Sequence, residues 1–113
     1  MKGTIKFGEM PVEMDANGAS VIFFKEIFKE DFLVKSQEKN VDQADLFLRM
    51  GFVMMKQAEF NNSPSDMRSV SKDDYVIWLV GFSPMDTINA AGEIAELFNA
   101  QEQGTSIPKK EGG

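Results

Sequence analysis

The alternation of apolar and polar residues near the start of the chain predicts a β-hairpin over residues 3–14. Ile5 and Phe7 alternate with polar residues, and Met10 and Val12 do the same after a Gly-Glu pair. A two-residue turn that begins with glycine closes hairpins readily, and here it would place Ile5 opposite Val12 and Phe7 opposite Met10. All four side chains would then share one face, so the turn and the strand register agree.

Beyond the hairpin the apolar spacing becomes helical and predicts four main helices, at residues 17–29, 42–60, 72–80 and 84–98. Ser83 and Pro84 suit the N-cap and the first position of the last helix. The sequence Ser71-Lys-Asp-Asp74 indicates a capping box that begins the helix before it. Phe32 and the two residues after it are apolar and could form a short fifth helix.

The predicted fold class is therefore α+β, mostly α: an N-terminal β-hairpin followed by a bundle of four or five helices. These elements would form a single globular domain over residues 1–100. Residues 61–70 contain a Ser-Pro-Ser sequence and are predicted to be a loop. Residues 101–113 are polar, include proline and glycine, and have no period, which predicts a flexible, disordered C-terminal tail.

Two of the predicted helices carry more apolar residues than one buried face requires. Ile22 and Phe23 fall outside the main stripe of the first helix, and Phe52 and Met55 fall outside that of the long helix. Either these helices are central to the fold, or part of each apolar surface faces a partner; for the first helix we favour the central position. A packed interior is also the commoner use of methionine-rich faces.

The composition of the chain excludes several classes of function. The chain has 113 residues, a net charge of −6 and neither cysteine nor histidine, so thiolate chemistry and histidine general-base catalysis are excluded. The acidic charge argues against nucleic-acid binding through phosphate contacts, and no run of about 20 apolar residues predicts a membrane span. We predict no catalytic residue, no metal site and no cofactor.

The acidic clusters have a structural explanation. Asp42 and Asp45 fall in the first turn of one predicted helix, and Asp73 and Asp74 fall in the first turn of another, where the helix dipole favours acids. A carboxylate-only enzyme would instead bring its carboxylates together in a deep polar cleft and perturb a pKa strongly. We favour capping over catalysis.

The order of several sequence blocks resembles one protein family. A hairpin of the type I-K-F-G-E-x-x-V-E-M is followed by F-K-E-I-F-x-x-D and a long helix. A W-L-x-x-F-x-P-M-D-x-x-x-A-A-x-E-I-x-x-L-F block comes next, and then T-S-x-P-K-K; in this chain the blocks begin at Ile5, Phe24, Trp78 and Thr105. Together they resemble the tail assembly chaperones of long-tailed phages and prophages of Gram-positive bacteria.

The resemblance implies a non-enzymatic protein that binds the tape measure protein and helps to recruit the major tail protein. It also implies a homo-oligomer, action in the host cytoplasm, and absence from the mature virion. A longer form would arise by ribosomal frameshifting, and the codons of Lys109 and Lys110 are candidates for a slippery run. A virion component, such as a tail-completion or head–tail connector subunit, is the alternative. The residues that we expect at a partner-binding or self-association surface are Ile22, Phe23, Phe52, Met55, Phe82 and Met85.

Overall fold

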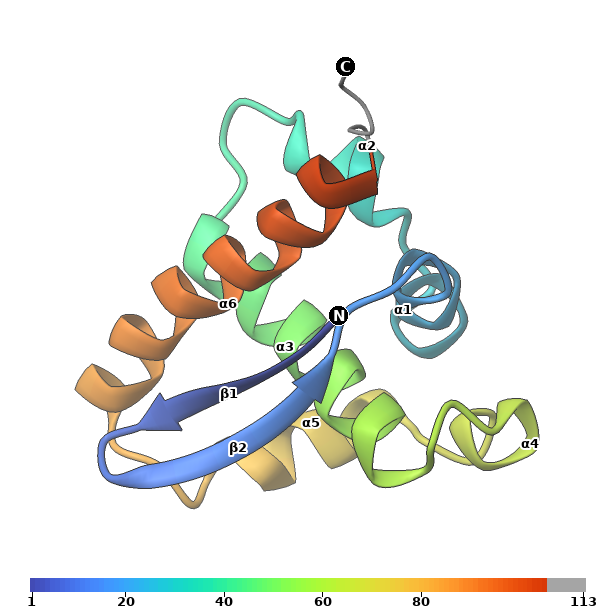
Figure 1. The fold of residues 1–113 in the computed structure, drawn as a ribbon. Helices are drawn as coiled ribbons and strands as arrows, with labels where there is room; N and C mark the ends of the chain where they lie inside the picture. Colours follow the sequence, from blue (N-terminus) through green and yellow to red (C-terminus); the bar gives the residue numbers. More distant parts are fainter. Residues whose placement is uncertain (106–113) are drawn as a thin grey trace.

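The computed structural model of this chain describes the backbone of residues 1–105 and the side chains of residues 1–100. It has the predicted fold class, α+β and mostly α, with an N-terminal antiparallel hairpin followed by helices (Figure 1). The elements, in chain order, are β1 (Lys2–Phe7), β2 (Met10–Asp15), α1 (Ser20–Phe28), α2 (Phe32–Ser36), α3 (Gln43–Glu59), α4 (Pro64–Met67), α5 (Lys72–Leu79) and α6 (Pro84–Thr105).

The hairpin has the predicted register, with Ile5 paired to Val12 and Phe7 to Met10. Gly8 adopts a positive φ of 67°, so the turn favours glycine, and a Cβ at this position would also lie 2.6 Å from a side-chain oxygen of Asp86, which would have to move. Ile5, Phe7 and Val12 are buried as expected. Met10 is 55% exposed, although Phe7, its partner across the hairpin, is buried against Trp78 and Phe82.

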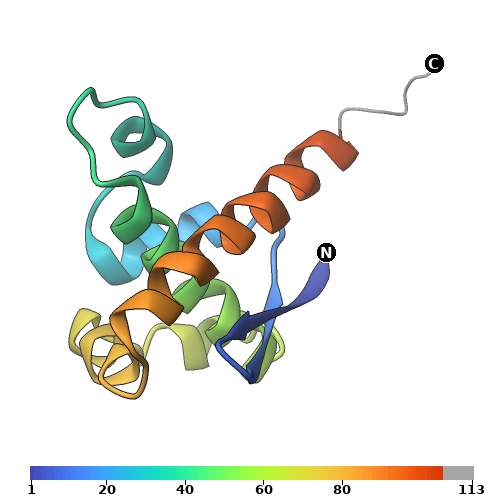
Figure 2. The same cartoon turned by 90° about the vertical axis from the view of Figure 1, so that its left-hand side faces the viewer.

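The centre of the fold is α3. It packs against β2, α1 and α6, and Figures 1 and 2 show α6 and the hairpin lying over it. This arrangement explains the surplus of apolar residues on α3, since Leu46, Met50, Phe52 and Val53 are all buried. The sequence analysis favoured the helix at residues 17–29 for the central position. Instead, α1 packs on one side of α3 and leaves Ile22 58% exposed.

Helix starts follow the predicted capping chemistry. The Ser83 hydroxyl accepts a hydrogen bond from the backbone N–H of Asp86 at 3.2 Å, and Pro84 occupies the first helical position of α6. The backbone N–H of Ser71 donates to a carboxylate oxygen of Asp74 at 3.0 Å, as in a capping box. Asp42 likewise accepts from the N–H of Asp45 at 3.1 Å at the start of α3.

Two segments and the number of helices differ from the prediction. The predicted loop at residues 61–70 contains α4, which begins at another serine cap: the Ser63 hydroxyl accepts from the N–H of Asp66. With α2 also present, the described residues form six helices rather than four or five. Helix α6 continues to Thr105, past the predicted end at residue 98 and into the predicted tail. The rest of that tail, residues 106–113, lies outside the described residues, as do Lys109 and Lys110.

A buried polar network joins the hairpin, α1 and α3. The Gln57 side chain is fully buried; its carbonyl accepts from the Ser20 hydroxyl at 2.7 Å. Its amide N–H groups donate to Asn17 at 3.0 Å and to Asn62 at 2.9 Å. Asn62, which has a positive φ of 61°, donates in turn to Asp15 at 2.9 Å. Because every buried polar atom of Gln57 is bonded, the network fixes how α3 meets the start of α1.

Candidate functional site

Helix α5 lies at the edge of the molecule and has a cleft on each flank. Both views place it at the lower edge of the fold (Figures 1 and 2). Val76 lines a charged cleft of about 510 Å³, and Ile77 lines an aromatic cleft of about 360 Å³.

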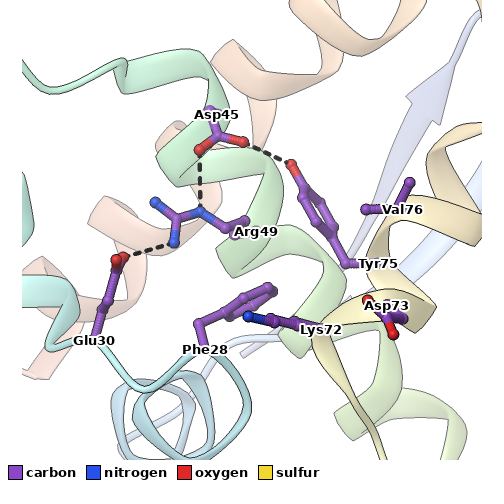
Figure 3. Close-up of a pocket in the computed structure, with 8 residues that line it drawn as sticks. All are labelled: Phe28, Glu30, Asp45, Arg49, Lys72, Asp73, Tyr75 and Val76. Atoms are coloured by element: carbon purple, nitrogen blue, oxygen red, sulfur yellow. Dashed lines mark hydrogen bonds and ion pairs between the residues drawn. The ribbon is translucent and has the colours of Figure 1, made fainter.

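The charged cleft is built around Arg49 of α3 (Figure 3). Its guanidinium Nη1 donates to Glu30 at 2.8 Å, and its Nε lies 3.1 Å from a carboxylate oxygen of Asp45. The guanidinium carbon also lies 5.4 Å from the ring centres of Phe24 and Phe28. Arg49 therefore joins the end of α1 to α3 through the Glu30 ion pair and two cation–π contacts, while its pair with Asp45 lies within α3.

Two groups in this cleft have perturbed pKa values, and both pKa values move away from pH 7. The hydrogen bond from Arg49 is the main reason that the pKa of Glu30 is lowered, so this carboxylate stays ionised at neutral pH. Tyr75 donates its hydroxyl proton to Asp45 at 3.1 Å, and burial together with the Asp45 charge raises the pKa of Tyr75 well above its ordinary value. Neither group is poised to exchange a proton near pH 7, so the cleft is poorly suited to acid–base catalysis.

The aromatic cleft lies between α5 and the C-terminal half of α3. Trp78 packs against Phe52 with ring centres 5.7 Å apart. Lys56 lies 5.3 Å from the Phe60 ring and pairs with Glu59 at 3.3 Å. The residues that line this cleft are Phe52, Met55, Lys56, Phe60, Ser69, Val70, Asp74, Ile77 and Trp78. The lining is mostly apolar and open to solvent, which suits an apolar side chain of a partner.

The outer face of α5 is apolar where a surface helix is normally polar. Val76 is 58% exposed, Ile77 68% and Val80 80%. The three lie within one helical turn of each other, so they form a continuous surface, which we call the α5 ridge. Tyr75, Trp78 and Leu79 face the opposite way, towards the core. Contiguous exposed apolar surface is one of the features that binding sites share.

A second apolar groove, of about 370 Å³, separates the start of α3 from α6. Small residues, Ala44, Ala91 and Gly92, line it together with Phe47 and Ile88, and Ile88 is 54% exposed. No charged side chain lines this groove, so it offers less specificity than the α5 ridge with its two clefts.

Two of the predicted partner-binding residues are not on the surface. Phe23 is 7% exposed and Phe52 is fully buried, with Phe28 of α1 and Trp78 of α5 against the Phe52 ring. Ile22 and Met85 are exposed, at 58% and 62%.

The remaining two predicted residues are half-buried. Met55 lines the aromatic cleft, and Phe82 packs against Phe7 and Trp78 with ring centres 4.5 and 5.4 Å away. The three residues of the α5 ridge are not among those predicted from the sequence. A run of six apolar residues, from Tyr75 to Val80, gives no period that would separate the buried side from the exposed one.

Within the described residues, no three side chains of the metal-binding types are grouped closely enough to hold an ion. None of the described helices combines the length and the apolar character that crossing a bilayer demands. No family model, curated protein or solved structure matches this chain. The case for function therefore depends on the resemblance of the sequence blocks and on the surfaces described above.

Proposed function

We propose that this protein is a tail assembly chaperone of a long-tailed phage or prophage of a Gram-positive bacterium. It is non-enzymatic, binds the tape measure protein and helps to recruit the major tail protein during assembly of the tail tube. It acts in the host cytoplasm and leaves before the virion is complete. The observation that carries the proposal is the α5 ridge: Val76, Ile77 and Val80 are 58–80% exposed beside an aromatic cleft.

The ridge matches what a long helical client requires. A helix that lays its apolar face on a partner presents anchors at spacings of three, four and seven residues. The ridge offers apolar side chains over about one turn, and the aromatic cleft beside it can receive a larger anchor from the client. Repeated weak contacts of this kind would coat a long client and still allow later release. Ile22 and Met85, exposed on other parts of the surface, are candidates for contacts between neighbouring copies.

Co-expression with the tape measure protein of the same phage tests the proposal. We expect the tape measure protein to be insoluble alone and to co-purify with the full chain. The double variant Ile77→Ser/Val80→Ser should lose most of this binding, because it removes the apolar ridge. The matched control is Leu33→Ser/Val34→Ser on α2, whose side chains are 47% and 60% exposed, and it should bind normally. Equal binding by both double variants would refute the assignment of the ridge.

Two further observations separate the chaperone from a virion component. Mass spectrometry of purified particles should not find this chain; its presence there would favour a tail-completion or connector subunit. The gene should carry a slippery heptamer near the codons of Lys109 and Lys110, followed by an overlapping open frame. A minor longer product with the same N-terminus should then be detected.

A further inference from the structure

The α5 ridge and its two clefts also define the kind of client segment that would bind, an inference that rests on the proposed function. We propose that the ridge binds a helical client segment that carries a lysine or arginine about two helical turns from an apolar anchor. The cationic side chain enters the charged cleft on one flank of α5. The apolar anchor enters the aromatic cleft on the other flank.

The charged cleft is one positive charge short. Three carboxylates line it, from Glu30, Asp45 and Asp73, against the two cations of Arg49 and Lys72. Arg49 is already held between Glu30 and Asp45 at 2.8 and 3.1 Å. One added lysine or arginine would bring the cleft to neutrality. A partner's carboxylate would instead raise the excess of negative charge.

Helix α5 has the same sign. It carries Asp73 and Asp74 against Lys72, a net charge of −1, and the whole chain carries −6. The resulting field attracts a cationic client. It also disfavours the ridge as a contact between two copies, because an isologous contact would bring two such surfaces together.

The position of Asp73 links the charged cleft to the α5 ridge. Asp73 lies three residues before Val76, four before Ile77 and seven before Val80, so it shares the outer face of α5 with the ridge. It is exposed, and it also lines the charged cleft. A client that covers the ridge therefore brings its charged residues within reach of this carboxylate.

The spacing of the client's residues follows from the width of α5. A helix with its side chains is about 10 Å across, so a client that spans both flanks must separate its cation and its anchor by about that distance. Along a helical client, about 10 Å corresponds to roughly seven residues. Such a spacing also keeps both side chains on one face of the client helix.

Model peptides test the inference with the full-length protein. The probe is a helical peptide of about 20 residues that has leucine anchors and one arginine about seven residues away. A first twin has glutamine in place of the arginine. A second twin has the arginine moved by two positions, which turns it by about 200° around the helix axis. Trp78 is the only tryptophan of the chain and lines the aromatic cleft, so its fluorescence reports binding by peptides that lack tryptophan.

We expect the arginine peptide to bind about tenfold more tightly than either twin at about 50 mM salt, and the advantage to disappear at about 500 mM. Asp73→Asn should remove the advantage, whereas Glu26→Gln, an exposed acid on α1, should preserve it. Ile77→Ser should weaken all three peptides by about tenfold or more. Val34→Ser, at a similarly exposed apolar position on α2, should leave them unchanged.

Several results would overturn the inference. Equal affinity for the three peptides, or an unchanged advantage of the arginine peptide in Asp73→Asn, would refute binding of a cationic side chain in the charged cleft. If the peptides bind Ile77→Ser as tightly as they bind the native chain, apolar binding at the ridge is refuted. Sedimentation that shows a dimer broken by Ile77→Ser would assign the ridge to a second copy instead.

The same tests separate this inference from the proposed function. If the tape measure protein binds through the ridge while the arginine peptide has no advantage, the client class is wrong and the chaperone role stands. If the peptides behave as expected but the tape measure protein does not bind, the docking surface stands and the chaperone role fails.

Discussion

Neighbouring residues on α1 allow a sharp test of which apolar side chains belong to the core. Ile22 and Phe23 are adjacent in the sequence, yet they are 58% and 7% exposed. A glutamate at position 23 removes a buried aromatic ring and leaves a carboxylate without a partner in an apolar site. Loss of a buried phenylalanine alone costs about 3–5 kcal/mol, and the stranded polar group adds to this. Whole domains are stable by only about 5–15 kcal/mol.

Urea melts of Phe23→Glu and Ile22→Glu, followed by far-UV circular dichroism, measure the difference. The midpoint for Phe23→Glu should fall by about 2 M or more, or the protein should already be unfolded in buffer. Ile22→Glu changes an exposed position and should alter the free energy of unfolding by no more than about 0.5 kcal/mol. Similar melts for the two variants would mean that Phe23 does not lie in the core. If the melts differ as expected, Ile22→Glu rather than Phe23→Glu is the variant with which to test self-association, because it keeps the fold.

Three further predictions concern single contacts. Ser83→Ala should lower the free energy of unfolding by about 1 kcal/mol in urea melts, because the first turn of α6 loses its cap; no loss would mean that the cap is redundant. Gln57→Leu should cost about 1–3 kcal/mol, because it strands the partners that Gln57 bonds; a more stable variant would contradict the network. Tyr75 is the only tyrosine, so the absorbance of its phenolate can be followed alone. Because its pKa is raised in the fold, the stability that it contributes is present below about pH 10 and lost as the pH rises further. The native chain should therefore ionise at clearly higher pH than the urea-unfolded chain, and coincident titrations would refute the buried Asp45 contact.

Much of the fold was predictable because its signals are local. A serine followed by proline or by aspartate three residues later satisfies helix N–H groups wherever it occurs, and so Ser71 and Ser83 begin helices where expected. The hairpin register needed only a glycine that tolerates positive φ and two alternating runs. The same local chemistry at Ser63 was missed, because α4 has only four residues and no period to support the cap signal.

The site was less predictable, because exposure depends on neighbours that lie far away in the sequence. Phe52 and Ile77 are both large apolar residues of helices, and the sequence does not separate them. Phe52 is fully buried because Phe28 of α1 and Tyr75 and Trp78 of α5 pack against its ring. Ile77 is 68% exposed because α5 lies at the edge and buries only the face of Tyr75, Trp78 and Leu79.

A surplus of apolar residues therefore has two meanings, and the number of covered sides decides between them. On a central helix such as α3, surplus apolar residues stabilise the fold, and polar replacements at Phe52 would unfold the chain. On a peripheral helix such as α5, they contribute little to folding, since Val80 at 80% exposure has almost no buried area to lose. Their apolar side chains are buried only when a partner covers them. We therefore propose that the α5 ridge is buried in a complex, because its exposed side chains contribute little to the stability of the isolated chain.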